Sequence, residues 1–172
     1  MERGNRVTNE EYLSQIYKLG FIVRYPTRYR VRDETVAAHS FFVSVIVLSL
    51  HKEYMFNLEE ALIATISHDI IEADTSDIPH DIKARHSELK KILSNIEEVE
   101  IKKYPEVVQF GINIFNKNSV EGKIVHLADV IQVSQYIESE MRLGNSTLTD
   151  IYVDSQLRQC YLKEDLKPYV RH

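Results

Sequence analysis

Cysteine is almost missing from this sequence, because Cys160 is the only one among 172 residues. A single cysteine cannot form an intrachain disulfide, and it cannot supply the several thiolates of a zinc knuckle. Chains that keep their cysteines unpaired are typical of reducing compartments inside the cell. We therefore expect a cytoplasmic location.

Turn-forming residues and long apolar runs are also scarce. Five glycines and four prolines leave little room for the many tight turns of β-rich architectures. The longest apolar run, FFVSVIVLSL at 41–50, falls far short of the roughly 20 residues that a membrane-spanning helix needs. The opening residues, MERGNRVTNEEY, lack the apolar core of a secretory signal. These absences predict a helical protein with no membrane partner.

An excess of positive charge is missing as well, since the formal net charge is -5 and the pI is about 5.8. A surface that wraps a nucleic-acid polymer needs a basic field, so we expect no such partner. A small anionic ligand is still compatible with local groups of basic residues. Apolar residues make up 44% of the chain and charged residues 27%, which is typical of a globular protein. The length fits one domain over residues 1–172.

Capping signals and hydrophobic periodicity divide the chain into helices. Thr8 to Glu11 (TNEE) is a capping box that predicts a helix through about Lys18. The residues at 20–34 break any periodicity and are expected to be irregular. The segment at 35–54 is apolar almost all round, which predicts a buried central helix. Further helices are expected at about 57–73, 82–102, 105–116, 119–143 and 149–162, with a loop at 75–80 and a C-cap at Gly144. The sequence therefore predicts an all-α bundle of six or seven helices.

The densest group of chemically active side chains lies in SHDIIEADTSDIP, at 67–79. His68 and Asp69 are adjacent, and Glu72 follows one turn later on the same side of the predicted helix. An imidazole together with a carboxylate suits a divalent ion such as Mn, Co, Fe or Zn. Two adjacent ligands cannot close a metal site, so further ligands must come from elsewhere in the chain.

His39 and Asp129 are the candidates for those further ligands, because each lies in an apolar stretch. Burying an imidazole or a carboxylate costs several kcal/mol unless the group is paired or bound to a metal. Taken singly, His39 is more often a satisfied core histidine, Asp129 a cap or ion-pair partner, and Glu72 a solvated helix end. The combination H…HD…D, distributed over three predicted helices, is the sharper signal and indicates a metal site.

Three stretches carry a longer signature: RYPTRYRVRDETVAAHS at 24–40, HDIIEADTSDIPHDIK at 68–83 and ADVIQVSQYIESEMRLGN at 128–145. With these motifs in this order, the chain resembles the HD-domain metal-dependent phosphohydrolases, and more narrowly the 5′-deoxynucleotidases typified by YfbR. The resemblance implies an HD-domain helical bundle that hydrolyses the 5′-phosphate of deoxynucleoside monophosphates. It also implies a homodimer or a higher homo-oligomer.

Carried over by position, the resemblance implies a role for each matching residue. One divalent ion (Co, Mn, Zn or Fe rather than Mg) would be held by His39, His68, Asp69 and Asp129. Glu72 would orient or deprotonate the attacking water, and Asp77 would hold the sugar or assist the water. The implied substrate contacts are Arg24 on the phosphate, Tyr25 near the base or sugar, and Asp77, Arg32 and Lys83.

Four arginines, at 24, 28, 30 and 32, lie within nine residues of this acidic chain. In an extended segment residues two apart share a side, so the four either face one pocket or form a solvated basic loop. The chain also departs from the family pattern: Tyr25 replaces the usual Trp, Ser76 the usual Gly, and Ala38 the Glu before the ligand histidine. These departures affect the substrate pocket rather than the metal ligands.

The substrate and the activity therefore have alternatives. Compact phage-type HD proteins, such as the dATP triphosphohydrolases, share the fold and the ligands but release triphosphate from a dNTP. A catalytically weak HD-fold nucleotide sensor is a second alternative, although such a sensor would not need the carboxylate of Glu72. A purely structural helical bundle is a third. A second metal held by His80, His86 or His126 is less favoured than a single ion.

Overall fold

The computed structural model describes residues 8–171, and within this part every regular element is helical. Seven helices have ten or more residues, which confirms the predicted all-α class. Isolated bridges pair Val23 with Thr35 and Tyr54 with Val170. The α-helices are α1 (Asn9–Lys18), α2 (Val36–Leu50), α3 (Leu58–Ser67), α4 (Glu72–Thr75), α5 (His80–Arg85), α6 (Ser87–Glu100), α7 (Glu106–Asn116), α8 (Val120–Arg142) and α9 (Thr149–Leu166), with 3₁₀ turns η1 (Ile101–Lys103) and η2 (Lys167–Tyr169).

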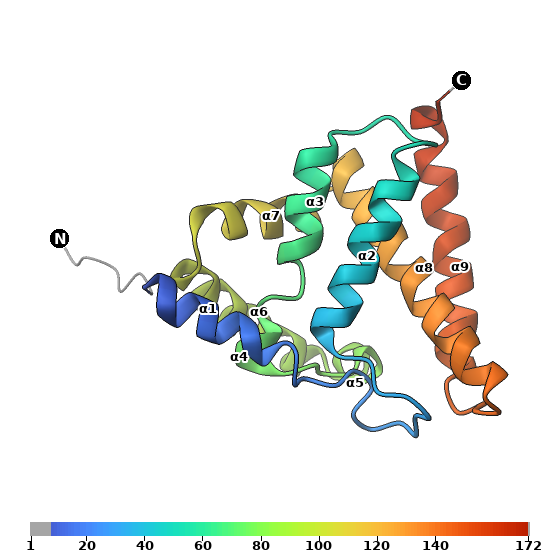
Figure 1. Ribbon diagram of the computed structural model, residues 1–172, viewed down its shortest axis with the longest axis horizontal. Coiled ribbons are helices and arrows are strands. Elements are labelled where there is room, and N and C mark those ends of the chain that lie inside the picture. Colours follow the sequence, from blue (N-terminus) through green and yellow to red (C-terminus); the bar gives the residue numbers. More distant parts are fainter. Residues whose placement is uncertain (1–7, 172) are drawn as a thin grey trace.

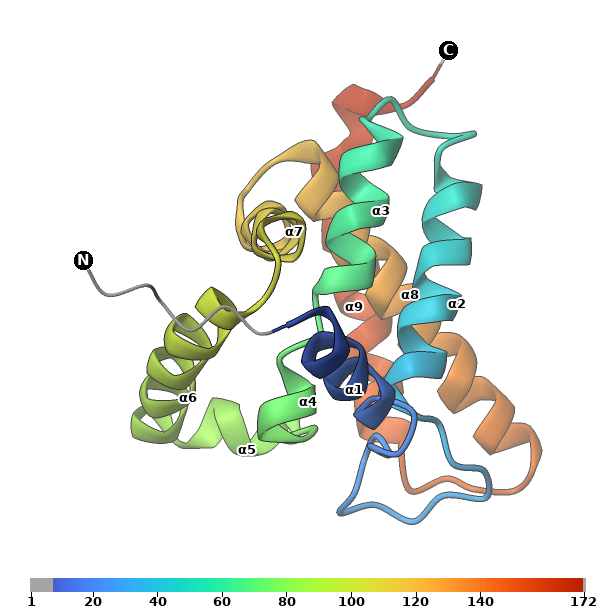
Figure 2. The ribbon, with the colours of Figure 1, turned by 60° about the vertical axis from the view of Figure 1, so that its left-hand side comes forward.

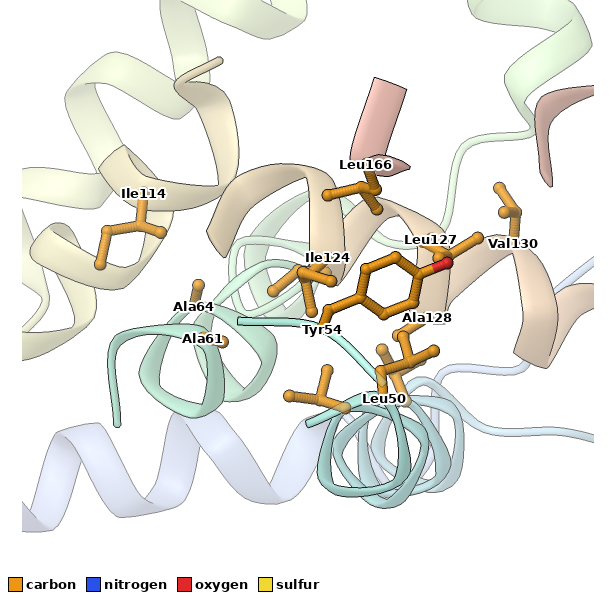
Figure 3. Close-up of a cluster of buried hydrophobic side chains, with 13 residues drawn as sticks. Leu50, Tyr54, Ala61, Ala64, Ile114, Ile124, Leu127, Ala128, Val130 and Leu166 are labelled. Carbon is orange, nitrogen blue, oxygen red and sulfur yellow. The ribbon is translucent and has the colours of Figure 1, made fainter. Parts of the chain in front are cut away.

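Helix α8 is the axis of the fold, because α2, α3, α7 and α9 all pack against it (Figure 1). The main core lies between these helices, and the segment after α2 adds Tyr54, whose ring lies among side chains of α8 and Leu166 of α9 (Figure 3). Leu127 and Ala128, just before Asp129, belong to this core and are fully buried. The position of Asp129 is therefore fixed by the packing of its own helix.

The predicted end of the long helix is confirmed at Gly144, which has φ +89°. The amide of Gly144 donates to the carbonyl of Met141, and the amide of Asn145 donates to the carbonyl of Glu140. This pair of hydrogen bonds is a Schellman motif, which needs a residue with positive φ after the last turn. A glycine adopts that conformation without steric cost.

A close approach of α7 to α3 depends on a second glycine. A Cβ at Gly111 would lie 2.5 Å from Ser67 Oγ and 2.7 Å from the carbonyl oxygen of Ile63. The bare backbone at this point lets α7 pack directly on the last turn of α3. The residue that follows Ser67 is His68, so this contact supports the start of the HD motif.

Two expected helix boundaries are wrong. Helix α3 ends at Ser67, so Asp69 lies in a turn rather than in the predicted helix at 57–73. The helix expected at 82–102 is broken at His86, where φ is -123° and ψ is 87°. The break turns α6 back from α5 (Figure 2), so that Leu93 lines the same cavity as Ile112 of α7. Both boundaries are set by tertiary packing, which helical periodicity does not report.

The prediction that α2 is buried on all sides is also wrong. One face carries His39, Val43 and Val47 into the core, and all three are fully buried. The other face exposes four large apolar side chains: Phe41 (63%), Phe42 (51%), Val45 (46%) and Leu48 (48%). No helix in the described part of the chain is long and apolar enough to cross a membrane.

Ser76 has φ 64° and ψ 167°, a conformation found almost only in glycine. The strain explains why glycine suits this position in the motif. We expect Ser76→Gly to raise the free energy of unfolding by about 1 kcal/mol and the melting temperature by about 2–4 °C. Thermal unfolding measures the change. The control Ser94→Gly, inside α6, should lower the melting temperature instead, and equal effects of both variants would contradict the account.

Candidate active site

Three packed helices bring the predicted metal ligands together. His39 lies in the first turn of α2, His68 caps the end of α3, and Asp129 lies in the middle of α8. Among the described residues, these three form the group whose ligand atoms could hold a metal ion, because the atoms all lie within 4.8 Å of one another. His39 is fully buried, and Asp129 has a side-chain exposure of 19%.

The individual distances join the Nε2 atoms of both imidazoles to carboxylate oxygens. His39 Nε2 lies 3.3 Å from Asp129 Oδ1 and 3.4 Å from His68 Nε2. Asp69 Oδ2 lies 3.2 Å from His68 Nε2 and 3.5 Å from His39 Nε2, and 3.4 Å from Arg24 Nη1. The structure thus brings three of the four predicted ligands into one group, while Asp69 contacts both imidazoles but lies outside that group, between the imidazoles and Arg24.

The hydrogen bonds behind the imidazoles determine what the site can accept. His68 Nδ1 lies 2.6 Å from the carbonyl oxygen of Thr65, which can only accept, so Nδ1 carries the hydrogen. His39 Nδ1 lies 2.7 Å from Gln132 Oε1, which also only accepts. In the neutral rings both Nε2 atoms are then free acceptors that face carboxylates. Acceptors that face one another repel, and the repulsion is removed either by a proton on Nε2 or by a cation between the atoms.

The donor set fits a divalent ion of the zinc type. Metal bonds of roughly 2.0–2.2 Å place neighbouring tetrahedral ligand atoms about 3.3–3.6 Å apart. The four contacts given above among the imidazole and carboxylate atoms span 3.2–3.5 Å. Two imidazoles with carboxylates accept several borderline ions, so this set does not select one of them.

The two aspartates remain ionised despite their burial. Burial acts to raise the pKa of Asp129, but with His39 protonated the hydrogen bond and charge of His39, together with the charge of Arg24, lower it to about 2. Burial likewise opposes ionisation of Asp69, but with the imidazoles protonated the charge and hydrogen bond of His68, followed by the charges of His39 and Arg24, hold its pKa well below the usual range. Both carboxylates are therefore available as ligands at neutral pH.

Glu72 lies at the start of α4 beside this group and lines the cavity around it. Its Oε2 atom is buried and makes no hydrogen bond in the described part of the protein. Burial and the nearby charges of Asp69 and Asp77 raise its pKa to about 9, against the opposing charges of Arg24 and Lys83. Without a metal ion the carboxyl is therefore neutral at neutral pH, and the charge of a bound cation would lower its pKa again and leave the free oxygen suited to accept a proton from a water molecule.

Arg24 and Tyr25 enter the site from the irregular segment after α1. The Arg24 guanidinium is mostly buried, with its Nη1 beside Asp69 and its Cζ 5.5 Å from the centre of the Tyr25 ring. Tyr25 has φ 56°, and its amide donates to Asp77 Oδ2 over 3.0 Å. Its ring stacks on Tyr136 at 5.5 Å, while its buried hydroxyl has no hydrogen-bond partner among the described residues. Asp77 therefore holds the strained backbone that presents Tyr25.

Glu140 of α8 fixes the part of this segment that follows Tyr25. The fully buried Glu140 carboxylate accepts hydrogen bonds from the amides of Val31 and Arg32 and from Asn145 Nδ2. Asn145 Nδ2 also donates to the carbonyl of Tyr29. Both views show this loop reaching the connection between α8 and α9 (Figures 1 and 2). The end of α8 thus determines where the segment with Arg24 and Tyr25 lies.

The four arginines do not share one pocket. Arg24 and Arg28 line the cavity, and Arg28 also pairs with Asp150 at 2.7 Å. Arg30 turns back to Asp33 and to the carbonyl of Tyr25. Arg32 Nη2 donates to Ser139 Oγ, and Arg32 lines neither cavity of the cleft. The structure therefore does not bring Arg32 to the site, because its backbone is tied to Glu140 and faces α8.

The cleft has two lobes that meet at the metal group. One, of about 450 Å³, contains Arg24, Tyr25, Asp77 and Asp129, and the other, of about 500 Å³, extends toward α6 and α7. Asp69, Glu72 and Lys83 line both lobes. His126 lines the first lobe, whereas His86 is exposed outside both, and the side chain of His80 lies outside the described part.

Three buried polar residues at the site were not predicted from the sequence: Glu34, Gln132 and Glu140. Gln132 follows Asp129 by three residues on a helix, so its position on the same face was a usable signal. Glu34 lies immediately before the Thr35 N-cap of α2, where an acidic residue has a common structural explanation. Only the folded structure shows that Gln132 Nε2 donates to Glu34 Oε1.

The fold is that of an HD-domain phosphohydrolase. The structure matches an HD-domain phosphohydrolase from Listeria innocua with a TM-score of 0.76 at 22% identity, covering 91% of this chain and 82% of that one. It also matches the cyanophage S-2L HD phosphohydrolase DatZ, solved with dA and one catalytic Zn²⁺ ion, with a TM-score of 0.65 at 18% identity, covering 96% and 88% of the two chains.

The chain belongs to the YfbR-like 5′-deoxynucleotidase family, whose model matches residues 11–165. A curated 5′-deoxynucleotidase from Pectobacterium atrosepticum is 26% identical over 157 residues, which cover 83% of this chain and 79% of that protein. The predicted family and enzyme class are therefore confirmed.

The raised pKa of Glu72 predicts a pH-dependent stability in protein freed of metal by a chelator. The neutral carboxyl binds its proton more tightly in the folded state, so its stabilisation is complete below about pH 4.5 and is lost as the pH rises toward about 9. Glu72→Gln cannot ionise, so it does not lose stability as the pH rises. We expect its melting temperature to exceed that of the wild type by several degrees at about pH 8 and to approach it at about pH 5.

Differential scanning calorimetry across this pH range measures the effect. The exposed Glu98 supplies the control, because Glu98→Gln should not change the pH dependence. A Glu72→Gln profile parallel to that of the wild type would contradict the assigned environment of Glu72.

Proposed function

We propose that this protein hydrolyses the 5′-phosphate of deoxynucleoside monophosphates with one divalent ion held by His39, His68, Asp69 and Asp129. The observation that supports it most is the convergence of two imidazole Nε2 atoms and two ionised aspartates within 3.2–3.5 Å contacts, beside a buried guanidinium. Phosphate-ester hydrolysis needs positive charge for the phosphoryl oxygens and a base for the water. The cleft contains groups for both tasks.

Different residues of the cleft would bind the phosphate and accept the proton of the water. A bound divalent ion would lower the pKa of a coordinated water molecule and neutralise phosphoryl charge. Arg24 offers a planar donor fork from a largely buried position, with an unpartnered Nε atom. Glu72 accepts the proton of the attacking water at its free Oε2 atom. Lys83 lines both lobes and adds a second positive charge.

A nucleoside fits the first lobe of the cleft. Tyr25 supplies an aromatic ring and a free hydroxyl there, and Asp77 is tied to the Tyr25 backbone at the same lobe. The DatZ structure with dA and the 5′-deoxynucleotidase relatives support a deoxynucleotide. We also propose that residues 1–172 form one HD domain and that the protein lies in the cytoplasm, as expected for a chain with one cysteine.

Triphosphate substrates are the second candidate, since the second lobe offers room beyond the metal group. Beyond the residues that it shares with the first lobe, its charged lining residues are Glu97, Glu98 and Lys102, so it adds no net positive charge for the β- and γ-phosphates. This balance favours the monophosphate. A nucleotide sensor is disfavoured by Glu72, because binding alone needs no buried base.

The chain is also proposed to form a homodimer through the exposed face of α2. The exposed surface area of its four apolar side chains is roughly 400 Å², if a fully accessible aromatic side chain is taken as about 200 Å². This is about half of the roughly 800 Å² that each partner of a stable interface buries. The sequence of α2, VAAHSFFVSVIVLSL, contains no acidic residue, lysine or arginine. Two copies related by a two-fold axis can therefore meet there without like-charge repulsion.

A product assay tests the activity. Deoxynucleoside mono-, di- and triphosphates are incubated with Mn, Co, Zn or Mg, and phosphate and triphosphate are measured separately. We expect phosphate release from monophosphates with Mn, Co or Zn. Glu72→Gln should lower kcat by about 10²–10⁴-fold while nucleotide binding is retained, because only the proton acceptor is removed.

Asp74 provides a matched carboxylate control, since it lies outside both cavities and accepts a hydrogen bond from the Tyr104 hydroxyl at 2.7 Å. Asp74→Asn should keep the wild-type rate. Triphosphate as the main product would establish the second candidate. Wild-type protein that binds nucleotide and metal without any release would establish the sensor.

Light scattering coupled to size exclusion tests the dimer, whose mass should be twice the 20.1 kDa of one chain. Val45→Glu places a charge in the centre of the α2 face and should produce monomers. Leu157→Glu changes an equally exposed leucine of α9 (55%) and should leave the dimer intact. A wild-type protein that is monomeric at micromolar concentration would reject the proposal.

A further inference from the structure

Glu34 and Gln132 form a buried polar pair behind the metal group, and the proposed reaction does not use it. Glu34 is 7% exposed and Gln132 is 4% exposed. The Gln132 carboxamide lies between two partners: its Nε2 donates to Glu34 Oε1, and its Oε1 lies 2.7 Å from His39 Nδ1. The pair joins the segment before α2 to the middle of α8.

The two hydrogen bonds that link Glu34, Gln132 and His39 each have one direction. An ionised carboxylate only accepts, so Glu34 requires the NH₂ group of Gln132 to point toward it. The carbonyl oxygen of the amide then points toward His39 and requires a hydrogen on Nδ1. The hydrogen on Nδ1 leaves Nε2 of the neutral ring as a free acceptor. Glu34 thus determines, through Gln132, which nitrogen of His39 is offered to a metal ion.

Glu34 also contacts the residue assigned to the phosphate. The amide of Arg24 donates to the carbonyl of Glu34 over 2.9 Å, and Arg24 Nε lies 3.8 Å from Glu34 Oε2. Arg24 Nε and Glu34 Oε2 are buried and make no hydrogen bond in the described part of the chain. Glu34 therefore approaches Arg24 directly and is linked to the imidazole of His39 through Gln132.

We propose that Glu34 and Gln132 are positioning residues that fix the tautomer of His39 for metal binding, and that Glu34 at the same time orients Arg24 for the phosphate. The inference rests on the proposed function only for the role of Arg24. Partners of this kind behind a metal-bound histidine typically contribute a factor of 10–100 to metal affinity. Neither residue touches the reacting atoms.

Two nearly isosteric variants separate the two tasks. Gln132→Met keeps the volume and removes both hydrogen bonds, so the His39 ring loses its acceptor. Glu34→Gln keeps the shape but can either donate or accept, so the Gln132 amide and the His39 ring lose their fixed directions. Glu34→Gln also removes the negative charge beside Arg24, whereas Gln132→Met leaves that charge in place.

Metal affinity and the ring spectrum of His39 provide readouts that do not need turnover. Competition with a chromophoric chelator should show Zn²⁺ and Co²⁺ binding weakened about 10–100-fold in both variants. Nitrogen-15 spectra of the imidazoles in metal-free protein should show one His39 tautomer in the wild type and a mixture in the variants. In saturating metal, Glu34→Gln should raise KM for the nucleotide more than Gln132→Met does, because only Glu34 contacts Arg24.

Ser134 supplies the control, because it is a buried polar residue of the same helix whose Oγ bonds Ser155 Oγ at 2.7 Å, away from the site. Ser134→Ala should lower stability without changing metal affinity or the His39 tautomer. Wild-type affinity and one tautomer in both test variants would overturn the proposal, as would equal losses in Ser134→Ala. If the wild type binds metal but hydrolyses no nucleotide, the proposed function fails, and affinity and ring spectra still decide this inference.

Discussion

The structure depends on one unfavourable arrangement: imidazole and carboxylate atoms from α2, α8 and the end of α3 converge in a largely buried space, where they repel one another unless protons or a cation lie between them. His39 and His68 turn their Nε2 atoms toward each other at 3.4 Å, and the carboxylates of Asp69 and Asp129 approach the same point. Such a group persists only where the surrounding packing enforces it. The core around Leu127 and Ala128 and the contact of Gly111 with Ser67 provide that enforcement.

The first lobe of the cleft is built on a different principle. Its residues come from an irregular segment, which has no helical hydrogen bonds of its own to fix it. Tyr25 is therefore held by Asp77, and the following loop by Glu140 and Asn145 at the end of α8. The same Schellman turn that ends α8 thus helps to shape the first lobe. In this way the part of the family motif after Asp129 fixes the position of the loop, while the HD motif supplies candidate metal ligands.

Much of the helical framework and the four candidate ligands could be predicted from the sequence. Capping residues and apolar periodicity are local, so Thr8, Gly144 and the length of α8 followed from them. The break at His86, the exposed face of α2 and the direction of Arg32 did not. Each of these depends on which other helix lies opposite, and local propensity carries no information about that.

By itself, the sequence determined the family and the identities of the side chains that can hold an ion, because residue types and their order are chemical facts of the chain. Only the tertiary structure decided how those side chains are oriented. The orientation of Gln132 between Glu34 and His39 requires three residues up to 98 positions apart to meet in a buried space. The direction of a hydrogen bond exists only between atoms that folding has brought together.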